Sequence, residues 1–190
     1  INSWHVYLPG YAWENYLRDK SEKNFKGSTH QYYKGFKQEN QPFINSESGN
    51  VWGYKGSTGD IDWSYDYHRM INSFRKFPEI AGWLYTEHHD VINEWNGYWK
   101  FDRSEKITGV DKILGGMTLN DFHSPVYLST GVEICKSVRG GEEINVPLFL
   151  SSMTSKNLGD ELIIDYELKH TNLIAQEHKI TSGKVNIKYK

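Results

Sequence analysis

Two carboxylates stand at the ends of two apolar segments, in a pattern that suits nucleophilic or acid–base chemistry. Residues 42–49 have the character of a buried strand that presents Glu47 and then turns at a glycine. Residues 80–87 repeat this design, with Glu87 at the end. Two parallel strands joined through a helix would place both acids on one rim of a sheet, where α/β folds and barrels carry their chemistry.

The segment between the two acids predicts the connecting helix. Over residues 62–77, apolar and aromatic side chains recur at three- and four-residue steps, with aspartates before them as possible N-caps and Pro78 as a stop. We therefore expect strands at 43–46 and 81–85 to be parallel neighbours. Residues 2–8 predict a further strand, and residues 11–23 predict a helix.

Four motifs carry a resemblance to a known family. They are Asn2-Ser3-Trp4-His5-Val6-Tyr7, Asn45-Ser46-Glu47-Ser48-Gly49, Trp63-Ser64-Tyr65-Asp66-Tyr67-His68, and Phe74-Arg75-Lys76-Phe77-Pro78-Glu79-Ile80 leading into Gly82-Trp83-Leu84-Tyr85. In order and spacing, residues 1–106 resemble the last part of the catalytic (β/α)8 barrel of family 2 glycoside hydrolases, the β-galactosidase and β-glucuronidase group. The resemblance implies that Glu47 is the nucleophile of a retaining glycosidase.

A retaining glycosidase needs a second carboxyl group, about 5–5.5 Å from the first, to protonate the leaving oxygen. The resemblance places this acid after an asparagine on an earlier strand, upstream of Ile1. Asn93-Glu94 has the right residue types but follows the nucleophile, so we do not assign it this role. A closed barrel also needs eight strand–helix units. We therefore expect this chain to be the tail of a larger enzyme and to be inactive in isolation.

Aromatic and polar residues at the predicted strand ends suit a carbohydrate ligand, because sugar rings pack on aromatic faces and their hydroxyls hydrogen-bond polar groups. The predicted substrate-binding residues are His5, Tyr7, Trp83, Tyr85, Glu87, His88 and Asp90. The family commonly has a tyrosine in the place of Tyr7 that contacts the nucleophile. Core packing for Tyr7 and Trp83, and a solvated loop for residues 87–90, are the alternatives. The adjacent His88 and His89 lack the one-turn spacing of a zinc protease motif, so we predict no metal or other cofactor.

The second half of the chain has a different composition. All seven tryptophans lie between Trp4 and Trp99, and beyond residue 106 short strand-like runs alternate with turn signals. These runs are residues 125–128, 132–137, 144–150, 161–169 and 184–189. We predict two domains, a partial barrel over 1–106 and an immunoglobulin-like antiparallel β-sandwich over 107–190, with the boundary between Ser104 and Met117. The predicted fold class is thus α/β plus all-β.

Composition restricts the partners. A net charge of −2 without long basic runs gives no case for nucleic acid, and no apolar stretch reaches membrane-spanning length. The predicted partners are carbohydrate and the remainder of the parent enzyme. Cys135 alone leaves the compartment open, although a periplasmic or secreted parent is favoured. The alternative function is a non-catalytic carbohydrate-binding or structural module of a larger polysaccharide-degrading protein.

Overall fold

The chain divides into two compact units. In the computed structural model, residues 1–49, 64–92, 94–109 and 117–188 are described. The first unit is Ile1–Met153 and the second is Thr154–Lys190. Residues 50–63, 93, 110–116 and 189–190, which include Trp63 and Asn93 of the motifs above, lie outside the described part.

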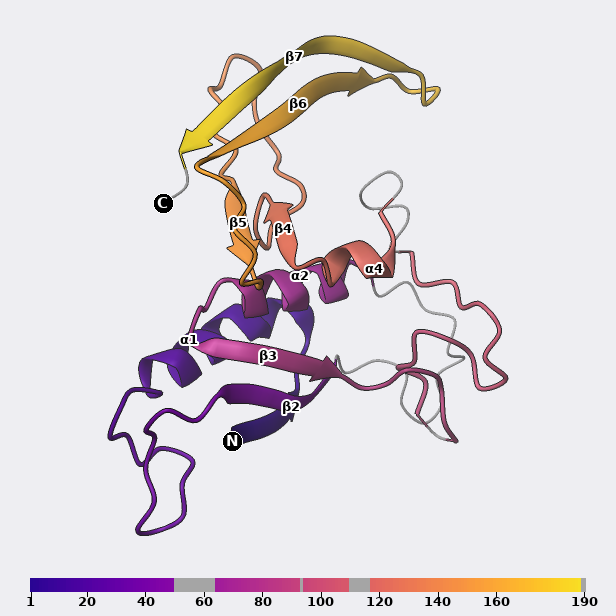
Figure 1. The fold of residues 1–190 in the computed structure, drawn as a ribbon. Helices are drawn as coiled ribbons and strands as arrows, with labels where there is room; N and C mark the ends of the chain where they lie inside the picture. Colours follow the sequence, from indigo (N-terminus) through magenta and orange to yellow (C-terminus); the bar gives the residue numbers. More distant parts are fainter. Residues whose placement is uncertain (50–63, 93, 110–116, 189–190) are drawn as a thin grey trace. The chain divides into compact units, whose positions relative to one another are not determined.

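A three-stranded parallel sheet lies at the centre of the first unit (Figure 1). Its strands are β1 (Asn2–Tyr7), β2 (Phe43–Gly49) and β3 (Ile80–Tyr85), in that spatial order. β2 pairs in parallel with both neighbours, which confirms that the two acid-bearing strands are parallel and adjacent.

The helices follow the predicted periodicity. A 3-10 turn η1 (Gly10–Ala12) leads into α1 (Trp13–Glu22), and α2 (Ser64–Arg75) connects β2 to β3. The helix predicted over 62–77 is confirmed from Ser64 to Arg75, while residues 62 and 63 lie outside the described part of the chain. None of the helices in the described ranges is long and apolar enough to cross a membrane.

One hydrophobic core joins the sheet to the two helices, which lie on one side of it (Figure 1). Trp4 stacks on Phe43 with ring centroids 4.1 Å apart, so the first two strands present aromatic faces to the helices. The buried helical members are Trp13 and Leu17 of α1 and Tyr67, Met70, Ile71 and Phe74 of α2. Each such side chain stabilises the fold by about 1.5–3 kcal/mol when fully buried.

The same core continues into residues 117–153. This segment contains α4 (Leu119–Phe122), β4 (Val126–Ser129) and β5 (Phe149–Ser152), and the two strands pair antiparallel. Phe122 is fully buried, with its ring centroid 5.4 Å from that of Tyr67. Tyr127 is 6% exposed and belongs to the same cluster. The compact unit therefore extends to Met153, rather than ending between Ser104 and Met117 as the composition suggested.

Arg75 at the end of α2 anchors this segment. Its guanidinium donates hydrogen bonds to the carbonyls of Phe122 at 2.6 Å and Ser124 at 2.9 Å, and to the hydroxyl of Ser151 at 3.2 Å. It also lies 4.5 Å from the ring centroid of Tyr127, a cation–π distance. The planar, multidentate donor set of arginine suits this position because three acceptors from two segments, residues 122–124 and β5, converge on it.

The second unit contains a long antiparallel hairpin of β6 (Glu161–Thr171) and β7 (Glu177–Lys188). β6 includes the strand predicted at 161–169, β7 covers residues 184–188 of the one predicted at 184–189, and β4 overlaps the prediction at 125–128. Residues 132–137 form no strand, which corrects that prediction, and the run at 144–150 is extended strand only from Phe149. The molecule is thus mixed α and β with parallel and antiparallel sheets. Closure into a barrel and assembly of a sandwich stay predictions.

Arg75→Lys tests the anchoring of residues 117–153. We expect the free energy of unfolding to fall by about 2–4 kcal/mol, because an ammonium cannot reach all three acceptors and buried carbonyls would lose charged donors. Urea unfolding followed by fluorescence measures the change. The exposed Arg18 pairs with Glu14 one helical turn away and lies 5.8 Å from the Phe77 ring centroid, contacts that a lysine can replace at an exposed position, so Arg18→Lys should leave the stability nearly unchanged. Equal, small effects of both substitutions would contradict the anchoring role.

Candidate functional site

Tyr7 and Glu47 meet at the carboxyl ends of β1 and β2. The Tyr7 hydroxyl donates a hydrogen bond to Oε1 of Glu47, across 40 residues of sequence. Both side chains are half-buried. The contact confirms the predicted partnership of these two residues. A phenol donor stabilises a carboxylate anion and fixes its orientation.

A β-bulge positions Glu47. Trp4 is paired with Asn45 but the next residue, His5, is paired with Glu47, so Ser46 is an extra residue in β2. The disrupted ladder is satisfied by side chains, since Asn45 Nδ2 and Ser46 Oγ both donate to the Trp4 carbonyl, at 3.2 and 3.0 Å. Bulges turn side chains out of the regular alternation and are frequent beside functional sites.

Gly49 allows the strand ends to approach closely. A Cβ at this position would lie 3.1 Å from the Tyr7 ring and 3.2 Å from the Thr86 carbonyl oxygen. The Thr86 amide donates to the Ser48 carbonyl at 2.7 Å, which extends the pairing of β2 and β3 to the rim. Because Gly49 has no side chain, Tyr7, Glu47 and Thr86 can lie close together at one edge of the sheet. His5, the register partner of Glu47, is exposed at the same end.

Glu87 follows β3 directly and is held in an unusual electrostatic environment. Burial, and then the nearby carboxylates of Glu94 and Asp90, raise the pKa of Glu87 to about 7, while Lys106 opposes the rise. Its Oε1 atom is shielded from solvent and has no hydrogen-bond partner among the described residues. The structure thus favours a neutral carboxyl group that could donate a proton or a hydrogen bond.

Tyr85, the last residue of β3, packs against aromatic side chains of α2 and of the loop that follows β3. Its ring stacks on that of Tyr98 at 4.7 Å and meets the edge of Tyr67 at 5.3 Å, and its hydroxyl donates to the Asn96 carbonyl at 2.7 Å. Burial, with the neighbouring Tyr98, raises the pKa of Tyr85 well above its ordinary value. Tyr85 thus packs against α2 and the following loop, and its predicted role in sugar binding stays a prediction.

Trp83 packs against α2, and its predicted role in substrate binding stays a prediction. Its ring stacks on Phe74 of α2 at 5.3 Å with an interplanar angle of 13°, and the Arg75 guanidinium lies 5.4 Å from its centroid. Alternation along a strand puts Trp83 and Tyr85 on the same face, as expected. Its contact with Phe74 shows that this face is the one that α2 covers.

Asp90 is likewise a structural residue instead of a substrate ligand. It forms a salt bridge with Lys106 at 2.6 Å, in which the side chains of Lys106 and Asp90 are 0% and 3% exposed. The same Asp90 oxygen accepts the Gly97 amide at 2.9 Å, and Lys106 also donates to the Trp95 carbonyl at 2.6 Å. These bonds close the loop that follows β3, and they leave the Asp90 carboxylate inaccessible to a sugar.

His88 and His89 follow Glu87 on this loop. His88 is exposed and His89 is half-buried, with ring centroids 6.0 Å apart in an edge-to-face arrangement. The described residues contain no cluster of three or more side chains suited to a metal ion. The substrate-binding role of His88 stays a prediction.

Sequence reasoning missed two residues that shape the site. Lys106 neutralises Asp90, and Tyr98 stacks against Tyr85 and exchanges a hydrogen bond with Tyr67 at 2.8 Å. The Tyr98 amide also donates to the Glu87 carbonyl at 3.2 Å. No periodic pattern marks either position, since both lie in an irregular loop.

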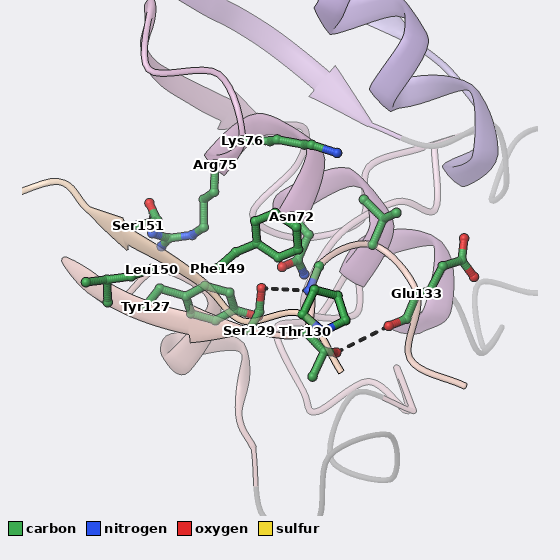
Figure 2. A pocket seen from close by; sticks show the side chains of 13 residues that line it. Asn72, Arg75, Lys76, Tyr127, Ser129, Thr130, Glu133, Phe149, Leu150 and Ser151 are labelled. Carbon is green, nitrogen blue, oxygen red and sulfur yellow. Dashed lines mark hydrogen bonds between the residues drawn. The ribbon is translucent and has the colours of Figure 1, made fainter. Parts of the chain in front are cut away.

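A separate cavity of about 390 Å³ lies between α2 and the β4–β5 pair (Figure 2). Arg75 and Lys76 lie along one side of it and Glu133 at the other end. Its walls are completed by Phe149 and by the turn in which Ser129 Oγ accepts the Gly131 amide at 3.1 Å. Neither the Tyr7–Glu47 pair nor Glu87 lines this cavity, and Arg75 is already bonded to three acceptors. We therefore interpret this cavity as a gap in the packing between α2 and the β4–β5 pair, and we assign it no function.

Comparison with known proteins adds no assignment. No protein-family profile matches this chain, and a search of curated proteins finds no significant match.

Asp90→Ala tests the loop closure. Removing one partner of a buried ion pair should lower the free energy of unfolding by about 3–5 kcal/mol, because the Lys106 ammonium would stay buried without its counter-charge. Asp90→Ala combined with Lys106→Met should recover part of that loss in a double-mutant cycle measured by urea unfolding. Asp19→Ala removes the exposed Asp19–Lys23 pair and should change little. Additive effects at 90 and 106 would contradict the coupling.

The raised pKa of Glu87 gives a pH dependence of defined sign. The folded state holds the proton up to about pH 7, whereas the unfolded state releases it near the ordinary value of 4.5. The stabilisation from this group is therefore fully present below pH 4.5 and is lost as the pH rises through 7. Relative to Glu87→Gln, the wild type should lose stability over this window. Glu22→Gln at the exposed end of α1 is the control. A carboxyl carbon NMR titration that puts Glu87 at its ordinary pKa would refute the assignment.

Proposed function

We propose that residues 1–106 belong to the catalytic barrel of a retaining glycoside hydrolase similar to family 2, with Glu47 as its nucleophile. The observation that carries the proposal is the Tyr7–Glu47 hydrogen bond at the carboxyl ends of two parallel strands. This is the rim at which parallel barrels place their catalytic groups. The resemblance of residues 45–49 and 2–7 to the family motifs gives the pair its chemical meaning.

The proposed reaction begins with attack by a Glu47 carboxylate oxygen on the anomeric carbon, as the bond to the leaving oxygen breaks. The covalent glycosyl intermediate is then hydrolysed by water, which restores the carboxylate. Tyr7 acts as a positioning residue, since its hydroxyl fixes the attacking carboxylate. Glu87, as a neutral acid near pH 7, would donate a hydrogen bond to a sugar hydroxyl from the adjoining strand end.

The sheet supports the proposal that further chain completes the barrel. β1 and β3 are the edge strands of the three described parallel strands. Unpaired edges in parallel sheets are uncommon, because such sheets are usually buried and continuous. In this proposal, the remaining strands and the acid/base carboxyl come from the rest of the parent enzyme. The partner substrate is a glycoside or oligosaccharide.

Trapping with an activated 2-deoxy-2-fluoro glycoside tests Glu47 in a parent protein that contains this chain. We expect a mass increase of one sugar unit, located by peptide mapping to residues 43–49. Glu47→Gln should abolish the adduct and reduce turnover by several orders of magnitude, because the covalent route is removed. The matched control is Glu94→Gln, which alters an exposed acid beyond β3 and should still label. An adduct on any other carboxylate would overturn the assignment.

Tyr7→Phe separates positioning from binding. Loss of the phenol donor should lower kcat by up to about 100-fold with a smaller effect on KM, since the attacking carboxylate is misplaced while the sugar contacts stay. Steady-state kinetics on the parent protein measures both. An unchanged kcat would mean that the Tyr7 hydrogen bond has no part in the reaction. Robust turnover by residues 1–190 alone would refute the proposal that the acid/base lies elsewhere.

A further inference from the structure

The hairpin of the second unit carries two histidines directly opposite each other. His170 of β6 and His178 of β7 are register partners, with ring centroids 6.5 Å apart and planes inclined by 28°. Both side chains are exposed. Register partners of an antiparallel pair project from the same face with Cβ atoms about 4.5–5.5 Å apart. The two imidazoles are therefore presented side by side to solvent.

We propose that His170 and His178, the cross-strand histidine pair, form a bidentate site for a divalent transition-metal ion such as Zn²⁺, Ni²⁺ or Cu²⁺. Imidazole nitrogens are preferred ligands of these ions, with Zn–N distances of about 2.0–2.1 Å. Two imidazoles on one ion have ring centroids about 5–6 Å apart by this bond length. The observed 6.5 Å needs only a small side-chain rotation, and exposed side chains rotate freely. Water would complete the coordination.

The hairpin holds the pair in register from both sides. On one side lies the turn, where the Asn172 side-chain oxygen accepts the amides of Ile174 and Gln176 at 3.1 and 2.9 Å. On the other side a bulge between Leu168 and Lys169 fixes how the strands continue. Because the turn sets the register, the second imidazole reaches the ion with little loss of chain entropy.

The charged neighbours do not compete for this face. Lys169 and Glu177 form a salt bridge at 2.9 Å, and each precedes one of the histidines in sequence. Adjacent residues in a strand point to opposite faces, so these charges lie on the reverse side of the ribbon. The alternative is that the rings simply stack, as cross-strand pairs do, which contributes about 0.2–1 kcal/mol.

Titration of the 190-residue chain with Zn²⁺, followed by calorimetry, tests the proposal. We expect one binding event in the wild type and an affinity about 10- to 100-fold lower in His170→Asn and in His178→Asn, because the second ligand binds intramolecularly. The matched control is a double variant, His88→Asn with His89→Asn, which removes the other adjacent histidines and should bind as the wild type does. Circular dichroism establishes that each variant keeps the fold.

A second measurement locates the ion without any substitution. Substoichiometric Ni²⁺ or Cu²⁺ should broaden the ring proton resonances of His170 and His178 before those of any other histidine. Absence of Zn²⁺ binding in the wild type, equal affinity in His170→Asn, or loss of binding only in the His88, His89 double variant would each overturn the proposal. So would selective broadening at another histidine.

Discussion

The structure of the first unit depends on the burial of α2. Eight of the twelve residues between Ser64 and Arg75 are buried, which is far more than the single stripe of a surface helix. The helix is the crossover between two parallel strands, and it is also the surface on which residues 117–153 pack. Its buried polar residues are satisfied locally, since Asn72 and Ser73 donate to carbonyls one turn earlier and the His68 ring bonds the Gly131 carbonyl at 3.0 Å.

The candidate site inherits its geometry from this helix. Tyr67 contacts Tyr85 and Phe74 contacts Trp83. These contacts between α2 and β3 fix the position of β3 in the sheet. The position of β3 in turn determines where Thr86 meets Gly49, and hence how closely Tyr7 and Glu47 approach the third strand. Aromatic side chains that look like a sugar platform in the sequence are thus the supports that keep the rim in place.

Patterns in short stretches of the sequence predicted the helices and strands that those stretches form. The three- and four-residue spacing of Tyr67, Ile71 and Phe74 predicted α2, and the two repeated strand designs predicted their parallel pairing. The Tyr7–Glu47 contact follows from the family resemblance, which implies a tyrosine beside the nucleophile, and the aligned ends of the parallel strands allow it. The orientation of Trp83 could not be predicted, since alternation assigns a common face to residues but does not say which face a helix covers. The pairing of Asp90 with Lys106 depends on an irregular loop that has no period, and the docking of Phe122 depends on a core that composition alone does not reveal.

Charge balance in the loop after β3 links stability to the proposed function. Burial raises the pKa of Glu87, and the nearby carboxylates of Glu94 and Asp90 add to this rise. Lys106 pairs with Asp90 at 2.6 Å, so the Asp90 carboxylate has a counter-charge inside the loop. Glu87 has no such cation in direct contact among the described residues, and the remaining repulsion is relieved by keeping its proton. The ion pair that closes the loop thus supplies Asp90 with a cation, whereas Glu87 at the rim has no such partner and keeps its proton up to about pH 7.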